Sequence, residues 1–500
     1  MIKSARFWRI AWTAVTATLA AAVLMSCDAS TRVLTPLPGV KGAPFSNGGA
    51  WDYVYISADP EFGYPATRFS DITEQLTSGQ LTERGITNVM IYGPYASTAK
   101  WRGLPPTGDL MDFDPQNGSL SDWREMVTAA NDRGITVTVY LALLYLDSSS
   151  PLFTKAQEDR AAGIDSWQSR LLLWDPRPHP ESDTPPSEWE FPRPPEGQWA
   201  FSQIAHEWYA TSWGLPALYY GNASTMEFAH RVLRFWMDNG VQGFEFDAPQ
   251  TMWGFTEGGP GGIGETRHSE LVTYPQKYRP DRQIYTEAEG LGTYENADLL
   301  NRVGYTHIML NLDTDDDDFV QRTIRGELSI DDLDRHYRTY SDGRREQGRG
   351  VYAPMIYLPD ASADLMALDV AVQGGSGAIV SLDRQLQVDR YRPEVVQGVF
   401  DVTRALAASP AEAPAASRER VEASPRETAY AIRRRSADGA KTAVNIYNLS
   451  SAQATVTVET GLSEGTRLVD LRGGAEIRTG VGGRMTVELP GYGWLFFATS

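Results

Sequence analysis

The sequence predicts an α/β protein, a (β/α)8 TIM barrel with a long insertion after the third strand and a C-terminal all-β sandwich domain. Three observations support this prediction. From Trp51 onwards, short apolar runs alternate with amphipathic stretches that end in glycine, which is typical of parallel strands and helices. A stretch rich in proline and tryptophan interrupts the alternation at about 147–225. Beyond residue 428 the pattern changes to short alternating runs between turn residues.

Eight apolar runs are the expected barrel strands, in a chain whose 500 residues suit one large barrel and a smaller module. Residues 123–134 and 226–240 have apolar side chains at helical spacing and end in glycine, so we expect helices there. An open doubly wound sheet is the alternative, but no glycine-rich phosphate loop follows the first run. The expected strands are 51–57, 87–93, 135–146, 244–246, 283–287, 307–312, 351–358 and 377–382.

The composition of the chain also divides it into domains. Residues 28–50 are rich in small residues, glycine and proline, and they are predicted to form a tether. The barrel domain is expected at 51–407, including an inserted loop domain at 147–225. After an Ala/Pro/Glu-rich stretch, six short runs with strand alternation predict the β-sandwich at 428–500.

The first 27 residues have the features of an export signal. Three basic residues precede an apolar run at 10–25, and the sequence Leu-Met-Ser-Cys ends at Cys27, the only cysteine of the chain. This ending resembles the bacterial lipobox, in which the cysteine is acylated. An ordinary signal peptide with an incidental cysteine is the alternative. We therefore expect a lipid-anchored protein of the bacterial cell envelope, on the periplasmic or surface face of a membrane.

Charge and histidine spacing exclude several other functions. The formal net charge of −19 argues against nucleic acid as a partner. The six histidines form no i, i+4 pair, so no zinc site is expected. The acidic run at 313–318 could bind Ca²⁺, but it lacks the glycine and the distal glutamate of an EF-hand loop. The sequence therefore predicts neither a metal site nor a cofactor.

Carboxylates follow three of the expected strands. Asp247 ends the fourth strand, Glu287 the fifth and Asp360 the seventh. Catalytic groups of barrel enzymes stand at the C-terminal ends of the strands, and a retaining glycosidase needs two carboxyl groups about 5–5.5 Å apart. Taken singly, each residue could equally be a helix cap or a surface group.

Several segments in order resemble glycoside hydrolase family 13, the α-amylase family, and in particular its oligo-1,6-glucosidase and α-glucosidase members. The segment GVQGFEFDAP at 240–249 resembles the nucleophile motif G-V-x-G-F-R-x-D-A, and TEAEG at 286–290 is similar to the acid/base motif. Residues 110–139 look like the family's stretch before and through the third strand. Pieces of 151–222 look like its inserted loop domain. The all-β tail fits the family's C-terminal domain.

This resemblance implies a retaining hydrolase or transglycosylase that acts on an α-linked glucan or related oligo- or polysaccharide. By the same resemblance, Asp247 is the nucleophile and Glu287 the general acid/base, with Glu289 as the alternative acid. Asp360 is the candidate for a carboxylate that stabilises the transition state. Trp253 is a candidate for sugar stacking, because eight of the fourteen tryptophans fall between Trp167 and Trp253.

The chain departs from the family's motifs at several positions. Glu245 stands where the family has an arginine, two residues before the nucleophile. The third-strand motif D-x-V-x-N-H becomes YLALLY, from Tyr140 to Tyr145, and the segment 59–71 lacks the calcium loop of this subgroup. Glu245, Tyr145 and Glu289 join Trp253 as candidates for substrate contact. A catalytically inactive carbohydrate-binding protein on the same barrel is the alternative function.

Overall fold

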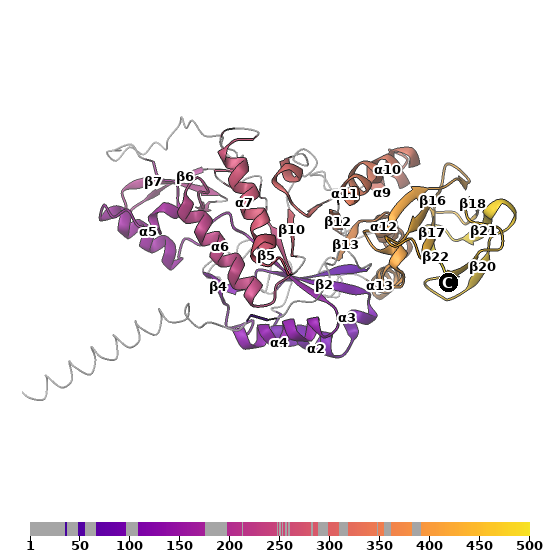
Figure 1. The fold of residues 1–500 in the computed structure, drawn as a ribbon, viewed down its shortest axis with the longest axis horizontal. Coiled ribbons are helices and arrows are strands. Elements are labelled where there is room, and N and C mark those ends of the chain that lie inside the picture. Colours follow the sequence, from indigo (N-terminus) through magenta and orange to yellow (C-terminus); the bar gives the residue numbers. More distant parts are fainter. Residues whose placement is uncertain are drawn as a thin grey trace, which may run out of the picture. The chain divides into compact units, whose positions relative to one another are not determined.

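The structure is a computed structural model in which residues 1–37 form one unit and residues 38–500 another (Figure 1). The helices and strands that the structure describes all belong to the second unit. The structure describes residues 36–37, 49–55, 67–96, 109–175, 198–212, 214–247, 249, 252, 254–255, 258, 261–281, 284–288, 299–309, 319–347, 349–354, 362–382 and 392–500.

Eight parallel strands close into a barrel, and each strand pairs with the next one along the chain until the last returns to the first. All eight coincide with apolar runs of the sequence, so the predicted (β/α)8 barrel is confirmed and the open doubly wound sheet was wrong. The barrel strands are β1 (Ala50–Tyr55), β2 (Ile86–Tyr92), β5 (Thr136–Leu141), β9 (Gly243–Phe246), β10 (Tyr285–Ala288), β11 (His307–Met309), β12 (Gly350–Pro354) and β13 (Ile379–Leu382).

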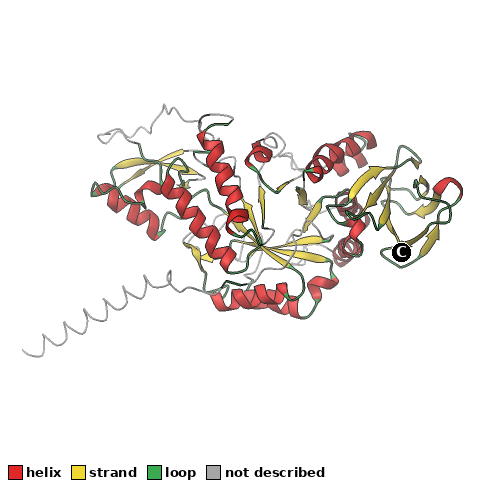
Figure 2. Cartoon of the chain, viewed as in Figure 1, coloured by secondary structure: helices red, strands yellow, loops and turns green. Residues whose placement is uncertain are grey.

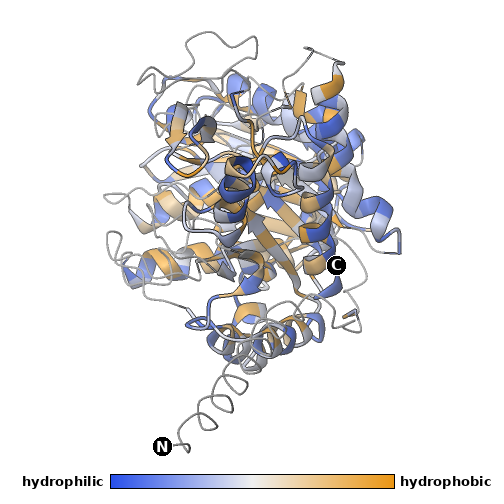
Figure 3. Ribbon diagram, turned by 90° about the vertical axis from the view of Figure 1, so that its left-hand side faces the viewer, coloured by the Kyte–Doolittle hydropathy of each residue, from blue (hydrophilic) through white to orange (hydrophobic). Residues whose placement is uncertain are grey.

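Amphipathic helices follow the strands. In α4, a capping box between Ser119 and Asp122 starts the helix, and the face with Trp123 and Met126 is buried. Figure 3 shows mainly hydrophobic strands surrounded by helices of mixed hydropathy. The helices that accompany the barrel strands are α2 (Phe69–Thr77), α3 (Gln80–Glu83), α4 (Leu120–Asn131), α6 (Ala223–Asp238), α7 (Ile263–Tyr278), α9 (Phe319–Ile324), α10 (Ile330–Tyr337), α11 (Gly343–Glu346), α12 (Ala363–Gly375) and α13 (Pro393–Ala407), with a π-helical turn at Arg338–Asp342.

The lower interior layer of the barrel consists of Trp51, Asn88, Thr138, Gly243 and Tyr285, near the N-terminal ends of the strands. The rings of Trp51 and Tyr285 stack with their centroids 5.3 Å apart. The hydroxyls of Thr138 and Tyr285 each donate a hydrogen bond to Asn88 Oδ1, at 2.9 Å. A Cβ on Gly243 would lie 2.2 Å from the Tyr285 ring, so only glycine leaves room for that ring. This layer is therefore filled and carries no charge.

The third apolar run leaves the barrel halfway along its length. The sequence predicts a strand over 135–146, but β5 ends at Leu141. Beyond it the chain pairs with the end of the insertion, where Leu146 N–H donates to Pro216 O at 2.8 Å. The described part of the insertion contains α5 (Pro151–Ala161), a 3-10 turn (Ser169–Leu171), β6 (Gln198–Ser202), β7 (Glu207–Ser212) and β8 (Leu215–Pro216), while β3 (Tyr95–Ala96) and β4 (Asp109–Phe113) precede it.

The C-terminal region is a β-sandwich, as predicted, of a six-stranded and a three-stranded sheet (Figure 2). Alternating residues such as Val444, Val456 and Phe497 form its core. Within the described residues, no helix has the length and hydropathy needed to cross a membrane. The sandwich strands are β14 (Ser417–Arg420), β15 (Ala423–Ser424), β16 (Ala429–Arg435), β17 (Thr442–Asn448), β18 (Ala454–Glu459), β19 (Arg467–Asp470), β20 (Glu476–Arg478), β21 (Arg484–Leu489) and β22 (Trp494–Thr499).

Candidate active site

Asp247 lies at the C-terminal end of β9, where barrel enzymes carry their chemistry. Its backbone N–H donates to Leu141 O, at the end of the neighbouring strand β5, at 3.3 Å. Glu287 belongs to β10, the next strand on the other side. In the backbone register, Glu287 pairs with Glu245, two residues before Asp247. The structure therefore brings Asp247 and Glu287 to adjacent strands, and it describes the backbone of Glu287 but not its side chain.

Four buried tyrosines, here called the tyrosine cluster, come from β2, β3, β5 and the turn after β5: Tyr92, Tyr95, Tyr140 and Tyr145. The Tyr140 hydroxyl donates a hydrogen bond to the Asp247 carboxylate. The rings of Tyr92 and Tyr140 pack with their centroids 4.1 Å apart. Burial raises the pKa of Tyr95 and of Tyr145, and the charge of Asp247 raises both further. The cluster thus surrounds the candidate nucleophile with aromatic rings and hydroxyl groups.

The ionisation of Asp247 reflects two opposing effects. Burial raises the pKa of its carboxyl to about 6, and the hydrogen bond from Tyr140 works against that rise. Above pH 6 the carboxylate is mostly ionised, which is the form that a nucleophile requires. Removal from water therefore shifts the pKa of Asp247 more than the hydrogen bond from Tyr140 does.

Glu245 lies on β9, between β5 and β10, and is buried, with 1% of its surface exposed. Its register partners are Tyr140 on β5 and Glu287 on β10. It shares the parity of Gly243, whose Cβ direction faces the Tyr285 ring, so Glu245 also points into the barrel. Tyr140 and Glu245 both depart from the family's motifs, and the structure shows that they are direct neighbours across β5 and β9.

The loop that follows Asp247 is fastened to the end of the insertion. Phe255 stacks on the buried ring of His268 with centroids 4.3 Å apart, and it also packs against Tyr220 with centroids 4.4 Å apart. Gly254 has a φ of +93°, and a Cβ there would lie 2.4 Å from the backbone nitrogen of Gly221. Only glycine allows this close approach of two backbones. The insertion therefore helps to hold the loop beside the candidate nucleophile.

Other residues predicted from the sequence have different outcomes. Tyr145 is in the tyrosine cluster and 1% exposed, so it lies close to Asp247 but inside the protein. Cys27, Trp253, Glu289 and Asp360 lie outside the described residues, as do the acidic run 313–318 and most of the segment 59–71. Among the residues that the structure describes, no three His, Cys, Asp or Glu side chains are grouped to hold a metal ion.

Sequence reasoning missed the roles of Tyr95 and Tyr140. In the sequence Tyr140 is only a departure from a motif, and no sequence pattern indicates Tyr95. A usable signal for Tyr140 is its place at the end of a barrel strand, with the parity of the residues that face the interior. Tyr95 lies on the two-residue strand β3 and reaches Ala142 N–H at 3.2 Å. That long-range contact has no local sequence signature.

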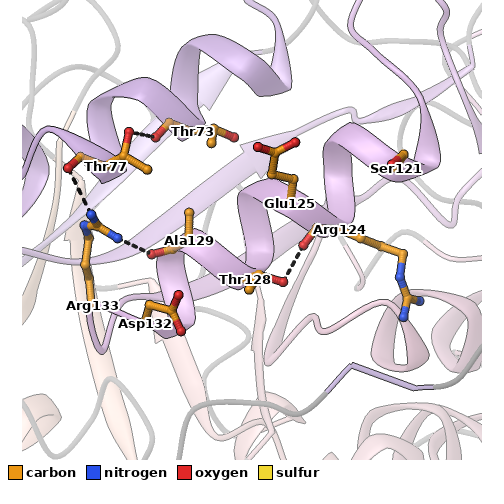
Figure 4. Close-up of a pocket in the computed structure, with 9 residues that line it drawn as sticks. All are labelled: Thr73, Thr77, Ser121, Arg124, Glu125, Thr128, Ala129, Asp132 and Arg133. Atoms are coloured by element: carbon orange, nitrogen blue, oxygen red, sulfur yellow. Dashed lines mark hydrogen bonds between the residues drawn. The ribbon is translucent and has the colours of Figure 1, made fainter.

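A separate hollow of about 440 Å³ lies between α2 and α4 (Figure 4). The residues that line it include none of the predicted site residues. Its polar groups bond within these helices and their ends: Thr128 Oγ1 donates to Arg124 O at 2.7 Å, and Arg133 donates to Thr77 O at 2.9 Å. The first bond lies within α4 and the second joins the turn after α4 to the end of α2, and we assign no chemistry to the hollow.

The similarity to known proteins includes the part of the chain that carries the candidate site. The sequence model of the family described as "Alpha amylase, catalytic domain" matches residues 81–346, which include Asp247 and Glu287. An α-glucosidase of Schizosaccharomyces pombe is 22% identical over 349 residues, covering 59% of this chain and 59% of that protein. An oligo-1,6-glucosidase of Parageobacillus thermoglucosidasius is 23% identical over 169 residues, covering 33% of this chain and 28% of that protein.

Solved structures extend the similarity of fold to nearly the whole chain. An Anoxybacillus α-amylase superimposes with a TM-score of 0.64 at 12% identity, covering 92% of this chain and 99% of that one. At this identity the match shows the fold alone. This chain spans 59% of the length of the first relative above and 28% of the second.

Proposed function

Because this chain belongs to the α-amylase family, we propose that it is a retaining glycoside hydrolase or transglycosylase acting on α-linked glucans or related oligosaccharides. The observation that carries the proposal is the placement of Asp247. It follows β9 at the C-terminal end of the barrel, its carboxyl group accepts a hydrogen bond from Tyr140, and Glu287 lies on the adjacent strand. The names of the glucosidase relatives support the same class of substrate.

The proposed reaction has two steps. Asp247 attacks the anomeric carbon while Glu287 protonates the leaving glycosidic oxygen, and a covalent glycosyl ester forms on Asp247. Glu287 then takes a proton from water or from a sugar hydroxyl, which displaces Asp247 and restores the original anomeric configuration. Asp360 is proposed to stabilise the positive charge that develops on the sugar. Trp253 is proposed to contact the ring, whereas Tyr145, which is buried, is proposed to act only as a neighbour of Asp247.

A test of this function combines a substrate screen with stereochemistry. The protein without its first 27 residues is incubated with a panel of α- and β-linked oligosaccharides, and early products are followed by ¹H NMR. An α-linked substrate should give the α-anomer first. A product that first appears as the β-anomer would exclude retention, and cleavage confined to β-linked substrates would contradict the substrate class.

The choice of acid is tested with two matched variants. Glu287→Gln should lower the rate on substrates with poor leaving groups far more than on activated aryl glycosides, because only the former need a proton donor. Glu289→Gln should show no such selectivity. If the selectivity follows Glu289 instead, the acid assignment moves to that residue.

The second candidate function is a catalytically inactive carbohydrate-binding protein. Glu245 favours it, since a buried carboxylate two residues before Asp247 replaces the arginine of the family's motif. Glu245→Arg distinguishes the two functions. If Glu245 belongs to a different sugar specificity, the change should lower activity on the true substrate. Activity that appears only in the variant would show that Glu245 disables the site.

We also propose that the protein is exported and anchored to a bacterial membrane by acylation of Cys27. The basic, apolar and Leu-Met-Ser-Cys segments of the N-terminus support this proposal. Cys27→Ser expressed in a bacterial host should move the protein from the membrane fraction to the soluble fraction, and incorporation of a labelled fatty acid should be lost. A wild-type protein that incorporates no label would contradict the anchor.

A further inference from the structure

We propose that Tyr140 is a positioning residue for Asp247, which fixes the direction and ionisation of this carboxylate with a neutral hydroxyl group. The inference depends on the proposed function only for the catalytic role of Asp247. It concerns a residue that the motif resemblance presents merely as a substitution, and it gives that residue a task in the reaction.

The first support is the geometry around the hydroxyl. Tyr140 is 1% exposed, and its ring packs against Tyr92 with centroids 4.1 Å apart. The ring is therefore held by its neighbours. The backbone N–H of Asp247 donates to the oxygen of Leu141, the residue after Tyr140, at 3.3 Å, and a hydrogen bond from the Tyr140 hydroxyl lowers the pKa of the Asp247 carboxyl. A buried donor with few accessible rotamers orients its acceptor better than a long flexible side chain does.

The second support is the carboxylate of Glu245, the residue of β9 that lies beside Tyr140. Tyr140 pairs in register with Glu245, a buried carboxylate on the strand that carries Asp247. Burial raises the pKa of the Asp247 carboxyl and the hydrogen bond from Tyr140 lowers it, while the charge of Asp247 acts on the buried hydroxyls of Tyr95 and Tyr145. Two carboxylates on one strand face raise each other's proton affinity when both approach ionisation. A hydroxyl donor aimed at Asp247 favours the ionised form of that residue.

The third support is the fit of this donor to the reaction. In the first step the Asp247 carboxylate loses its negative charge as it forms the ester, and in the second step the charge returns. A neutral hydroxyl can stay beside Asp247 while the charge is lost and restored. An arginine in its place would be an unpaired cation next to the neutral ester. The hydrogen bond should nevertheless be strongest to the free carboxylate, which keeps the nucleophile ionised and aligned before attack.

The kinetic test compares the pH dependence of kcat/KM in the wild type and in Tyr140→Phe. Removing the donor should raise the pKa of Asp247, so the acidic limb of the profile should move upward by roughly one pH unit. Tyr285→Phe is the matched control, because it removes a buried hydroxyl inside the barrel that bonds to Asn88 rather than to Asp247. The control should leave the position of the acidic limb unchanged. An unshifted limb in Tyr140→Phe would overturn the proposal.

A second test needs no activity and therefore separates this inference from the proposed function. Thermal unfolding is measured for the wild type, Tyr140→Phe, Asp247→Asn and the double variant at pH 4.5 and pH 7.5. With Asp247 intact, the loss of Tm caused by Tyr140→Phe should be larger at pH 7.5, where the carboxylate is ionised. In the Asp247→Asn background, the loss should be equal at both pH values. If the loss of Tm is the same at pH 4.5 and pH 7.5 even with Asp247 intact, the proposal is overturned, whether or not the enzyme is active.

Discussion

The lower interior layer and the layer above it use the same eight strands for opposite purposes. Below, Trp51, Asn88 and Tyr285 pack together with hydroxyl-to-amide hydrogen bonds and no charge. Two residues further along the strands, Glu245 is a buried carboxylate, and Asp247 follows it at the mouth. The difference teaches that strand position, more than residue type, separates the part of the barrel that stabilises the fold from the part that can perform chemistry.

The physical reason is the different cost of the two layers. Asn88 Oδ1 has exchanged water for hydroxyl donors, so the burial of this neutral oxygen costs little, and only Nδ2 of the amide lacks a hydrogen-bond partner among the described residues. A buried carboxylate loses hydration that protein dipoles only partly replace, and its pKa rises as a result. The pKa of about 6 for Asp247 is the mark of that cost. Enzymes commonly accept such destabilisation where a reactive group must be kept out of water.

The largest expected effect is on activity, at the upper layer. Asp247→Asn removes the nucleophile but keeps the shape of the side chain, so kcat/KM should fall roughly 10⁴-fold or more while the fold persists. Steady-state kinetics and circular dichroism on the same sample measure the two effects. A variant that keeps a tenth of the activity would remove Asp247 from the mechanism.

The lower layer should respond through stability. Gly243→Ala places a Cβ 2.2 Å from the Tyr285 ring, so the ring must move and the free energy of unfolding should fall by about 3 kcal/mol. Gly343→Ala is the matched control, since it lies in α11 with open space around its Cβ direction. That change should be neutral or stabilise by up to about 1 kcal/mol. Chemical denaturation of both variants measures the difference, and equal results would contradict the packing of this layer.

Much of the fold was predictable because its signals are local. The eight apolar runs, the glycine that ends the helix at 123–134 and the change to strand alternation after 428 are each readable within about a dozen residues. The error in the third run has a physical cause. Leu141 and Leu144 are equally buried, one in the barrel and the other against the insertion, and hydropathy does not distinguish two kinds of buried neighbour.

The site was predictable only in part. Asp247 could be found because it ends a strand inside a specific motif, and the adjacency of Glu287 followed from the order of strands in a closed barrel. The pairing of Tyr140 with Glu245 depends on the register between β5 and β9, which joins residues more than a hundred positions apart. No short sequence pattern encodes that register. Two substitutions that looked independent in the sequence are neighbours in the structure.

A smaller effect is expected at the amide of the lower layer. Asn88→Ala leaves the hydroxyls of Thr138 and Tyr285 without their acceptor and opens a small cavity, so the free energy of unfolding should fall by about 1–3 kcal/mol. The acidic limb of the pH profile should not move, because the change lies below the carboxylates. Urea unfolding and kcat/KM against pH are the measurements. A shifted limb would show that the two layers are electrostatically coupled.

The smallest effect is the dependence of stability on pH at Asp247. Burial raises the pKa of this carboxyl from 3.8 to about 6, so between these values the folded state binds more protons than the unfolded state. The free energy of unfolding therefore falls as the pH rises from about 4 to 6. Asp247→Asn removes this loss. Between pH 4 and pH 7 the free energy of unfolding of the variant should therefore rise by about 1–2 kcal/mol relative to that of the wild type, a value reduced for partial exposure of the side chain.

For a control residue in the β-sandwich, the pH dependence of the free energy of unfolding should have the opposite sign. Hydrogen bonds from the Ser436 hydroxyl and from Ala440 N–H lower the pKa of Asp438, so this carboxylate contributes stability at neutral pH that is lost in acid. Asp438→Asn should therefore lose stability relative to the wild type as the pH rises above about 4. Urea denaturation of both variants between pH 3 and pH 7.5 compares the slopes. Slopes of the same sign would mean that Asp247 is stabilised as an anion by more than Tyr140, and that the upper layer costs the fold nothing.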